Sequence, residues 1–451
     1  MIRRKERGFN MKRKYMKALS VLAALSLTIS LTACGGKNSD NSASSGNSGA
    51  ANDGTKKIQI KVYAQHFDED TARPFDYAVE ELKKEMPNVE IVLDEAVQDG
   101  YQKLKTYAAT GNMPDIYETD WTTLQTFAKS KNVELLDSYP DTADFKSKLN
   151  TGLESRLTAP DGHVYAFPYT GIEFQLIYYN KDIFQKAGIQ TPIKTVDQLA
   201  DAAKKLSAAG YTPMAIFAKE KWITTAFYAG LVTRKDAKGF GDLEAGKPAA
   251  LPTAFVTAAE QMKKLQEAGL FDANATNTNY DQASSQFYSG KAAMFINGQW
   301  EIYSSTEKLG DKVDWMYTPA KDEATYDSSK GFINGAGSPG GFSVSPSSKN
   351  KETAVKVASF LAQKYSEYKY TVLGSPIVSV KVDKPMTGEV PPMMKRIADE
   401  VLPNVKSYAT AVNNVQIKNV IDDNTQNMMV SGFTVKQFAD NVNRILAKEN
   451  K

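Results

Sequence analysis

Ile58-Gln-Ile-Lys-Val-Tyr-Ala64 alternates apolar and polar side chains, which is the pattern of a β-strand with one buried face. After this stretch, apolar residues recur at helical spacing over residues 75–86, and a second alternating run covers residues 89–93. A further helix is expected over residues 101–110, followed by a short strand at Ile116. Strands that alternate with helices predict a βαβαβ unit built on a mainly parallel sheet.

The same alternation continues along the rest of the chain. Thr195-Val-Asp-Gln198 and Thr434-Val-Lys-Gln437 are capping boxes, which mark the starts of two helices. Helices are also expected over residues 253–268 and 351–364, with strand segments scattered between the helices. No internal repeat is visible. The body from Lys56 onward is therefore predicted to be α/β.

The residues before this body have the pattern of a secretory leader. A basic stretch ends at Lys17 and precedes an apolar run over residues 18–31, which has the length of a signal-peptide core. The run is shorter than the roughly 20 apolar residues that a membrane-spanning helix needs. We therefore expect residues 1–33 to be a signal peptide, with Met11 as an alternative start.

Leu31-Thr-Ala-Cys34 ends the leader and resembles a bacterial lipobox, in which the cysteine is diacylated and becomes the mature N-terminus. Cys34 is the only cysteine, so a disulfide within the chain is excluded. Residues 34–56 are rich in Ser, Asn and Gly, which predicts a flexible tether. The expected arrangement is a folded body lipid-anchored at Cys34 on the extracytoplasmic face of the bacterial cell membrane.

Length and charge narrow the class of protein further. A chain of 451 residues suggests two or three domains, or one large discontinuous fold. The whole chain carries 55 basic and 52 acidic residues, and residues 1–33 hold eight of the basic residues and one acid. Without them the counts are 47 and 51, a net charge near −4. Nothing in this balance indicates a nucleic-acid partner.

Several stretches, in this order, are shared with one known family. They are Gly111-Asn-Met-Pro-Asp-Ile116, Tyr165-Ala-Phe-Pro-Tyr169 with Tyr178-Tyr-Asn-Lys-Asp-Ile-Phe184, Phe287-Tyr-Ser-Gly-Lys-Ala-Ala-Met294 with Asn297-Gly-Gln-Trp300, and Gly340-Gly-Phe342 continuing to Lys351. Together they resemble the extracellular sugar-binding proteins of ATP-driven importers, the group that includes maltose-binding protein. Each motif alone is only suggestive, but their order over residues 58 to about 380 makes chance a poor explanation.

The resemblance implies a two-lobed, periplasmic-binding-protein-like fold with discontinuous lobes, hinge crossovers and a ligand cleft between the lobes. One lobe would combine residues 57–171 with 336–382, and the other residues 172–335 with 383–451. The implied function is that of the solute-binding component of an ABC transporter. Such a protein captures a carbohydrate by hinge closure and delivers it to the permease transmembrane subunits, as a monomer without a cofactor.

Candidate ligand-binding residues come from the same resemblance and from the chemistry of sugars. Sugar rings present an apolar face that stacks on aromatic side chains and a rim of hydroxyls that acids and amides bind. Trp300 and Glu173 match ligand-contacting positions of the family. Further candidates are expected in loops after strands: Tyr169, Trp222, Glu118, Asp120 and Trp121. His66 follows the first strand, and Gly341 would either let the backbone approach the ligand or relieve crowding at the hinge.

The sequence also departs from the pattern of maltose-binding protein. Thr119 and Thr122 stand where that pattern has Trp and Asp. This departure argues against maltose as the ligand, and we expect a different sugar.

Other chemistries have less support. Gly335-Ala-Gly-Ser-Pro-Gly340 spells GxGxxG, but a strand rather than a helix is expected after it, which disfavours dinucleotide binding. His66 and His163 are the only histidines, which argues against a histidine–cysteine metal site. Three alternatives stay open: the same fold binding a non-sugar solute such as a polyamine, iron complex or peptide; a lipid-anchored carbohydrate-cleaving enzyme; and a sensory co-receptor.

Overall fold

The computed structural model describes residues 57–332, 334–406, 408–409, 412 and 414–450. The expected signal peptide, the lipidation site Cys34 and the tether lie outside the described residues. Within the described part of the chain, no helix is long and apolar enough to cross a membrane.

The first sheet confirms the expected βαβαβ unit. Its strand order is β2-β1-β3-β9, in which β1 pairs in parallel with β2 and β3, and β9 is antiparallel to β3. The strands are β1 (Ile58–Ala64), β2 (Val89–Glu95), β3 (Ile116–Thr119) and β9 (Gly341–Val344). The GxGxxG pattern over residues 335–340 is followed directly by strand β9 and not by a helix, as expected.

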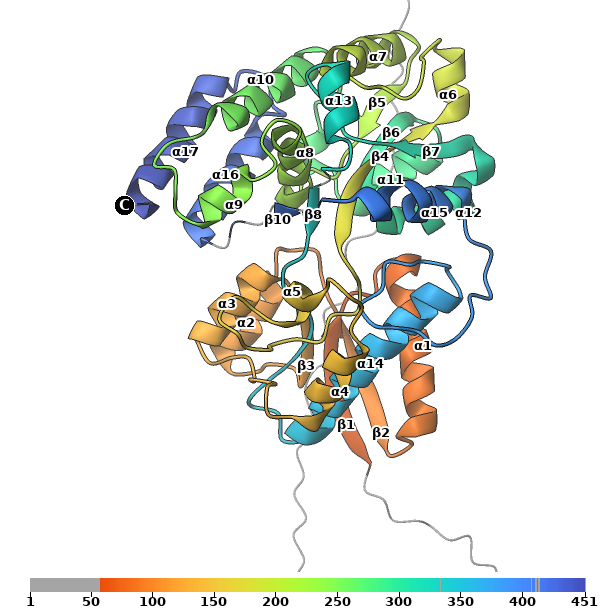
Figure 1. The fold of residues 1–451 in the computed structure, drawn as a ribbon, viewed down its shortest axis with the longest axis vertical. Coiled ribbons are helices and arrows are strands. Elements are labelled where there is room, and N and C mark those ends of the chain that lie inside the picture. The colour runs from red at the N-terminus through yellow and green to blue at the C-terminus, as the bar shows by residue number, and fades with distance from the viewer. Residues whose placement is uncertain (1–56, 333, 407, 410–411, 413, 451) are drawn as a thin grey trace, which may run out of the picture. The chain divides into compact units, whose positions relative to one another are not determined.

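Helices pack around this sheet and complete what we call the first lobe (Figure 1). They are α1 (Glu69–Glu85), α2 (Gln102–Thr110), α3 (Trp121–Lys129), α4 (Pro140–Lys148), α5 (Glu154–Leu157) and α14 (Lys351–Thr371). Helix α1 begins earlier than its apolar spacing predicts, because Asp68 caps it by accepting a 2.8 Å hydrogen bond from the Thr71 N–H.

The second sheet is mixed and is centred on β4. Its order is β10-β8-β4-β6-β5, and β7 also pairs with β4. Strand β4 is antiparallel to β6, β7 and β8, whereas β5 and β6 are parallel. The strands are β4 (Glu173–Asn180), β5 (Thr212–Ala215), β6 (Ala292–Gly298), β7 (Val313–Met316), β8 (Asn334–Ala336) and β10 (Tyr408–Ala409).

The helices around this sheet complete the second lobe (Figure 1). They are α6 (Lys181–Lys186), α7 (Val196–Ala208), α8 (Lys221–Thr233), α9 (Gly239–Glu244), α10 (Thr253–Glu267), α11 (Tyr280–Tyr288), α12 (Ile302–Leu309), α13 (Glu323–Ser329), α15 (Pro392–Arg396), α16 (Val415–Asn427) and α17 (Val435–Glu449). Both expected capping boxes are present, at the starts of α7 and α17.

The lobes have separate hydrophobic cores. One continuous core belongs to the second lobe and includes Leu176, Phe227 and Leu446. Two smaller cores lie in the first lobe, one around Phe75 and the other around Tyr117. Separate cores allow each lobe to keep its own packing when the two move relative to each other. The residue boundaries expected for the lobes stay a prediction.

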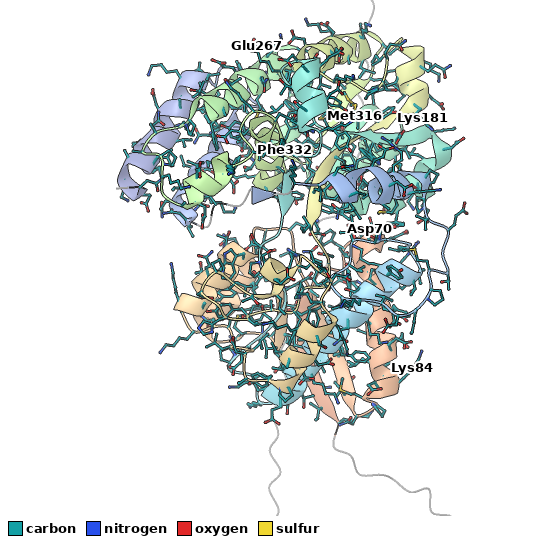
Figure 2. The ribbon with its side chains drawn as sticks, in the orientation of Figure 1. Asp70, Lys84, Lys181, Glu267, Met316 and Phe332 are labelled. Carbon is teal, nitrogen blue, oxygen red and sulfur yellow. The ribbon has the colours of Figure 1, made fainter. Side chains whose placement is uncertain are left out.

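The first and second lobes touch along α1 and α12. The Ser304 hydroxyl of α12 donates a 2.9 Å hydrogen bond to the buried Asp70 carboxylate of α1, which lies at the lobe boundary (Figure 2). Burial, reinforced by Glu301, raises the pKa of Asp70 well above its usual value. Phe67 and Tyr280 make a second contact, with ring centroids 6.2 Å apart.

Candidate functional site

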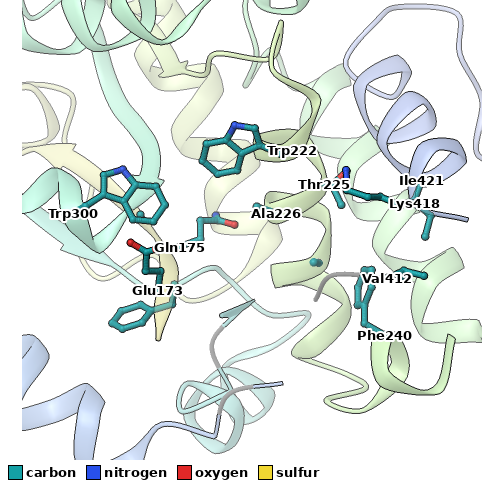
Figure 3. Close-up of a pocket in the computed structure, with 13 residues that line it drawn as sticks. Glu173, Gln175, Trp222, Thr225, Ala226, Phe240, Trp300, Val412, Lys418 and Ile421 are labelled. Carbon is teal, nitrogen blue, oxygen red and sulfur yellow. The ribbon is translucent and has the colours of Figure 1, made fainter. Parts of the chain in front are cut away.

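A pocket of about 300 Å³ opens on the second lobe (Figure 3). It lies where β4, the end of β6, α8, α9 and α16 meet, so segments more than 200 residues apart in the sequence form one wall. It is lined by Glu173, Phe174, Gln175, Trp222, Thr225, Ala226, Ala229, Phe240, Gly298, Trp300, Val412, Lys418 and Ile421. The lining therefore contains three of the expected residues: Trp300, Glu173 and Trp222.

Trp300 lies just beyond the end of β6, as the sequence predicts. The strand continues through Gly298 and is followed by a short 3₁₀ helix, Gln299–Glu301, which carries the tryptophan. The indole ring folds back over Gly298, since a Cβ at that position would lie 2.0 Å from the ring. Glycine at this position is thus required by the placement of the indole, which forms one side of the pocket.

Trp222 forms the adjoining side of the pocket. It is the second residue of α8, so its expected position in a loop is wrong. Its ring centroid is 6.2 Å from that of Trp300, with 46° between the ring planes. Its indole N–H donates a 3.2 Å hydrogen bond to Glu220, whose pKa burial raises to about 7. Trp222 is 41% exposed, so its face is available to a ligand.

A buried hydrogen-bond network holds the Trp300 segment in place. Glu301 accepts hydrogen bonds from Tyr280 at 2.8 Å, from Asn297 at 2.8 Å and from Tyr288. Burial raises the pKa of Glu301 to about 7, although these donors oppose the shift. The network connects the end of β6 to α11 and holds Glu301 in place. It therefore also fixes the backbone of the preceding residue, Trp300.

Strand β4 supplies two polar side chains to the pocket. Glu173 begins the strand and is partly exposed, and Gln175 follows it on the same face because side chains of a strand alternate. The Gln175 side chain is 93% buried, and neither its oxygen nor its nitrogen has a hydrogen-bond partner among the described residues. Figure 3 shows its amide between Trp222 and Glu173.

The far wall of the pocket is mainly apolar. Phe240 of α9, Ile421 of α16 and Val412, which precedes α16, supply it together with alanines of α8. Its cation, Lys418, donates a 2.6 Å hydrogen bond to Asp422, and this carboxylate raises the Lys418 pKa although burial opposes the shift. The positive charge at this wall is therefore already paired.

Glu118 does not lie in a loop, as the sequence reasoning expected, but within β3. It is buried and accepts a 2.6 Å hydrogen bond from the Gln65 N–H and another from the Tyr169 hydroxyl. Burial raises its pKa to about 7, and the Glu173 carboxylate of the second lobe adds to this shift. The carboxylate of Glu118 on the first lobe thus interacts electrostatically with that of Glu173 in the pocket of the second lobe.

Tyr169 is placed by the residues around it. Its ring packs on Tyr365 of α14, with 4.4 Å between the centroids, and its backbone carbonyl accepts a 2.8 Å hydrogen bond from the Ser366 hydroxyl. Helix α14 extends to Thr371, seven residues past the expected end, and so brings both partners to Tyr169.

Asp120 and Trp121 have structural roles at the start of α3. Asp120 caps the helix by accepting a 2.8 Å hydrogen bond from the Thr123 N–H. Trp121 is the first helical residue, not a loop residue, and it is 7% exposed in a core where it packs against Tyr165. The structure thus does not bring Trp121 to the pocket wall.

His66 and Gly341 also have local explanations. His66 lies 2.9 Å from Asp76 and 3.5 Å from Glu95, so its ring nitrogens are engaged on the first lobe. Gly341 has a φ of 123°, and a Cβ there would lie 2.1 Å from the Phe167 carbonyl oxygen. The crowding alternative accounts for Gly341 without a ligand. The ligand roles of all these residues stay predictions.

Most residues of the second-lobe wall were not predicted from the sequence. Gln175 could have been found from Glu173, because alternation in a strand places both on one face. Phe240, Lys418 and Ile421 gave no signal, since their place depends on how α9 and α16 pack. No group of three or more potential metal ligands was found among the described residues.

Comparisons with known proteins point to one class. A sequence model of the family described as bacterial extracellular solute-binding protein matches residues 68–364. An uncharacterized ABC transporter extracellular-binding protein of Pyrococcus horikoshii is 26% identical over 64% of this chain and 65% of its own. A maltooligosaccharide ABC transporter solute-binding lipoprotein of Streptococcus pneumoniae is 27% identical over the same shares. The match thus spans just under two thirds of the length of these relatives.

Solved structures share the fold. A protein from a study of xylan utilization by Caldanaerobius polysaccharolyticus is 24% identical and aligns over 86% of this chain and 100% of its own, with a TM-score of 0.76. A chitin oligosaccharide binding protein is 20% identical over 87% and 99%, with a TM-score of 0.71. At these identities the likeness establishes the two-lobed α/β fold.

Proposed function

Because this chain belongs to the bacterial extracellular solute-binding protein family, we propose that it captures a carbohydrate, in the form of an oligosaccharide, and delivers it to the transmembrane subunits of an ABC importer. The observation that carries the sugar assignment is the pair of tryptophans at the pocket, with ring centroids 6.2 Å apart. Aromatic rings at this spacing offer two adjoining platforms for the apolar faces of sugar rings.

The polar groups of the pocket complement the tryptophans. Glu173 supplies carboxylate oxygens that accept hydrogen bonds from hydroxyls, and Gln175 supplies both a donor and an acceptor. A few polar groups in a largely apolar pocket are what orients a small ligand. The relatives named as maltooligosaccharide ABC transporter solute-binding lipoproteins add independent support for a sugar ligand.

Capture would proceed by closure of the first lobe over the ligand bound to the second. The Glu118 and Tyr169 side chains, hydrogen-bonded to each other, would face the sugar from the first lobe. A ligand stabilises the closed form only by binding it more tightly than the open form. Closure then exposes the surface that the permease reads, and the sugar leaves chemically unchanged, so the protein is not an enzyme in this proposal.

The anchoring of the protein is part of the same proposal. Diacylation at Cys34 would hold a monomeric receptor on the extracytoplasmic face of the cell membrane, with residues 34–56 as its tether. In cell fractionation, Cys34→Ala should move the protein from the membrane fraction to the soluble fraction. A variant that stays membrane-bound to the same extent would contradict anchoring at this residue.

The sugar assignment is tested by thermal unfolding in the presence of a solute panel. It contains malto-, xylo-, chito- and raffinose-type saccharides, with spermidine, a peptide mixture and metal salts as controls. A ligand at 100 times its Kd adds about 2.7 kcal/mol to the free energy of unfolding, which raises the midpoint clearly. We expect a rise with one saccharide family and recovery of that sugar at unchanged mass.

One observation favours a second candidate, a cationic solute such as a polyamine. Acidic side chains outnumber unpaired cations near the pocket, since Glu173 and Glu220 lie on the second lobe while Lys418 is paired with Asp422. Aromatic rings and carboxylates also bind ammonium groups. A midpoint raised by spermidine and by no saccharide would overturn the sugar assignment in favour of this candidate. A sugar recovered in cleaved form would instead favour the enzyme alternative.

A further inference from the structure

Gln175 has a side chain that the protein itself leaves without a partner. It is 93% buried, and its amide oxygen and nitrogen both lack a hydrogen-bond partner among the described residues. A buried polar group without a partner destabilises a protein, because it has lost its hydrogen bonds to water. Such groups are uncommon in folded proteins and call for an explanation. Gln175 lines the pocket, so a bound ligand could supply the missing hydrogen-bond partner.

The position of the amide is fixed by its strand. Gln175 pairs with Gly298 across β4 and β6, directly beneath the segment that carries Trp300. Its neighbour in the strand, Phe174, is bound through its backbone N–H to Gln299 at 2.8 Å, so this part of β4 is held on both sides. The amide therefore lies on a rigid element at the pocket wall, with its nitrogen and oxygen shielded from solvent.

The surface next to the amide is apolar. Beyond Gln175 the wall consists mainly of Ala226 and Ala229 of α8, Phe240 of α9, Val412 and Ile421. Its polar members, Thr225 and Lys418, both donate hydrogen bonds to Asp422. A sugar that carries only hydroxyls would place some of them against these carbon atoms, where they would lose hydrogen bonds to water. A ligand group that fits must offer a hydrogen bond to Gln175 and a small apolar end to the wall.

We propose that this pocket selects sugars bearing an acetamido substituent, with Gln175 as the residue that determines this specificity. The Gln175 oxygen would accept a hydrogen bond from the acetamido N–H, while its nitrogen donates to the hydroxyl on the adjacent ring carbon. The methyl group would then lie against Ala226 and the apolar wall. This inference rests on the proposed carbohydrate function and narrows it to N-acetylated hexosamine units.

The same wall disfavours an acidic sugar. Its cation, Lys418, is neutralised by Asp422 at 2.6 Å, and Glu173 adds a negative charge to the pocket. A uronic acid carboxylate would therefore be repelled and would find no unpaired cation among the described lining residues.

Three trisaccharides that differ only at C2 test the proposal by titration calorimetry with the purified protein. Triacetylchitotriose carries acetamido groups, the glucosamine trimer carries ammonium groups, and cellotriose carries hydroxyls. We expect the Kd of triacetylchitotriose to be at least about tenfold lower than that of cellotriose, from one hydrogen bond and a buried methyl. Equal or tighter binding of either other trimer would overturn the acetamido assignment.

Two variants separate the amide from the apolar wall. Gln175→Leu should weaken triacetylchitotriose binding about tenfold or more, while the unliganded protein unfolds at the same or a higher temperature, because a buried unpaired amide is gone. Ala226→Leu should fill the space for the methyl group and reduce the preference over cellotriose. Gln185→Leu, at an exposed position of α6, is the matched control and should leave each Kd unchanged.

The outcomes distinguish this inference from the function on which it rests. Binding of malto- or xylo-saccharides without any preference for the acetylated trimer would overturn the acetamido assignment and leave the carbohydrate function standing. Binding of spermidine and of no saccharide would overturn both. If Gln175→Leu lowers the unfolding temperature and keeps the preference, the amide is structural and its proposed role is wrong. Should that variant not fold, Ala226→Leu and the three trimers decide the question.

Discussion

The position of the Trp300 ring depends on the residue at position 298. The ring rests on Gly298, where a Cβ would lie 2.0 Å away, and the following residue, Glu301, anchors the segment from below. The stacking of a sugar on Trp300 therefore depends on three residues: Gly298, Trp300 and Glu301. The motif Asn297-Gly-Gln-Trp300 contains the first two.

Removing or displacing the Trp300 ring should weaken sugar binding strongly. We expect Trp300→Ala to raise the Kd about 30-fold or more, because a buried aromatic anchor contributes about 2 kcal/mol or more. Gly298→Ala should have a similar effect, since its Cβ would push the ring out of place. Titration calorimetry measures both.

The matched control is Trp315→Phe. Trp315 is buried in β7, donates a 3.1 Å hydrogen bond to the Met393 carbonyl and is not one of the residues that line the pocket. This variant should lower the unfolding temperature and leave the Kd unchanged. A Trp300→Ala variant that binds sugar as the wild type does would refute the stacking account.

Glu118 should make stability depend on pH. Its pKa is raised from 4.5 in the unfolded chain to about 7 in the folded protein, mainly by burial. Between these values the folded state holds a proton that the unfolded chain has released, so stability falls as pH rises from about 4.5 to about 7. Glu118→Gln removes this loss and should be about 3 kcal/mol more stable than wild type at pH 8, with little difference at pH 5.

Urea unfolding at the two pH values checks this prediction. Glu220 and Glu301 have similarly raised pKa values, but they titrate in both proteins and cancel in the comparison. Glu260→Gln, at an exposed position of α10, should show no pH-dependent difference from wild type. The stability difference between Glu118→Gln and wild type should grow in favour of the variant from pH 5 to pH 8. A difference that shrinks over this range would contradict burial as the cause of the raised pKa.

At the scale of single residues, the sequence identified side chains by type better than by place. Trp300 and Glu173 line the pocket, because a motif with a fixed spacing carried both. Trp121 was expected in a loop and lies in a core, because the start of α3 at Asp120 decides which way it points. Gln175 was missed because an amide has no distinctive sequence pattern until its burial is known.

Elements were predicted where a local signal defines them. The capping boxes at Thr195 and Thr434 start α7 and α17, since the signal and the structure involve the same four residues. Helix α14 was expected to end near Lys364 and continues to Thr371. Its last turns are stabilised by tertiary contacts, such as that of Tyr365 with Tyr169, which no local pattern reveals.

Strand β9 gives a test at the scale of an element. Gly341 begins it with a φ of 123°, and a Cβ would lie 2.1 Å from the backbone of Phe167. Gly341→Ala should therefore lower the free energy of unfolding by about 3 kcal/mol or more, through strain and displacement of the strand. Urea unfolding measures the loss.

Gly340→Ala is the natural control for this substitution. Its Cβ would lie 3.2 Å from the Thr119 carbonyl oxygen, which a small shift relieves. We expect a loss of about 1 kcal/mol or less. Equal losses at both positions would contradict the close approach of β9 to Phe167 as the reason for Gly341.

At the scale of the whole molecule, the α/β class followed from alternating elements, whereas the pocket did not follow from any local pattern. Its wall joins β4 to α16, more than 200 residues later in the chain, and both depend on the packing of α8 between them. Only the complete second-lobe core determines that arrangement. The two-lobed fold was predicted from the family resemblance, because members of a family share their long-range packing as well as their motifs.

Ligand binding should change the size of the molecule. Because the lobes have separate cores and meet through a few contacts such as Ser304 with Asp70, we expect a bound sugar to draw them together. Small-angle X-ray scattering should show a smaller radius of gyration with saturating sugar. Trp300→Ala at the same sugar concentration should keep the larger value, and an unchanged wild-type radius at saturation would rule out closure as the signal.

The most direct test of the carbohydrate account is equilibrium dialysis of the purified protein against the saccharide that most raises its unfolding temperature, followed by mass spectrometry of the recovered ligand. We predict one sugar bound per chain, at unchanged mass, and its loss in Trp300→Ala. Failure of every saccharide to bind, with spermidine or a peptide retained instead, would contradict the account.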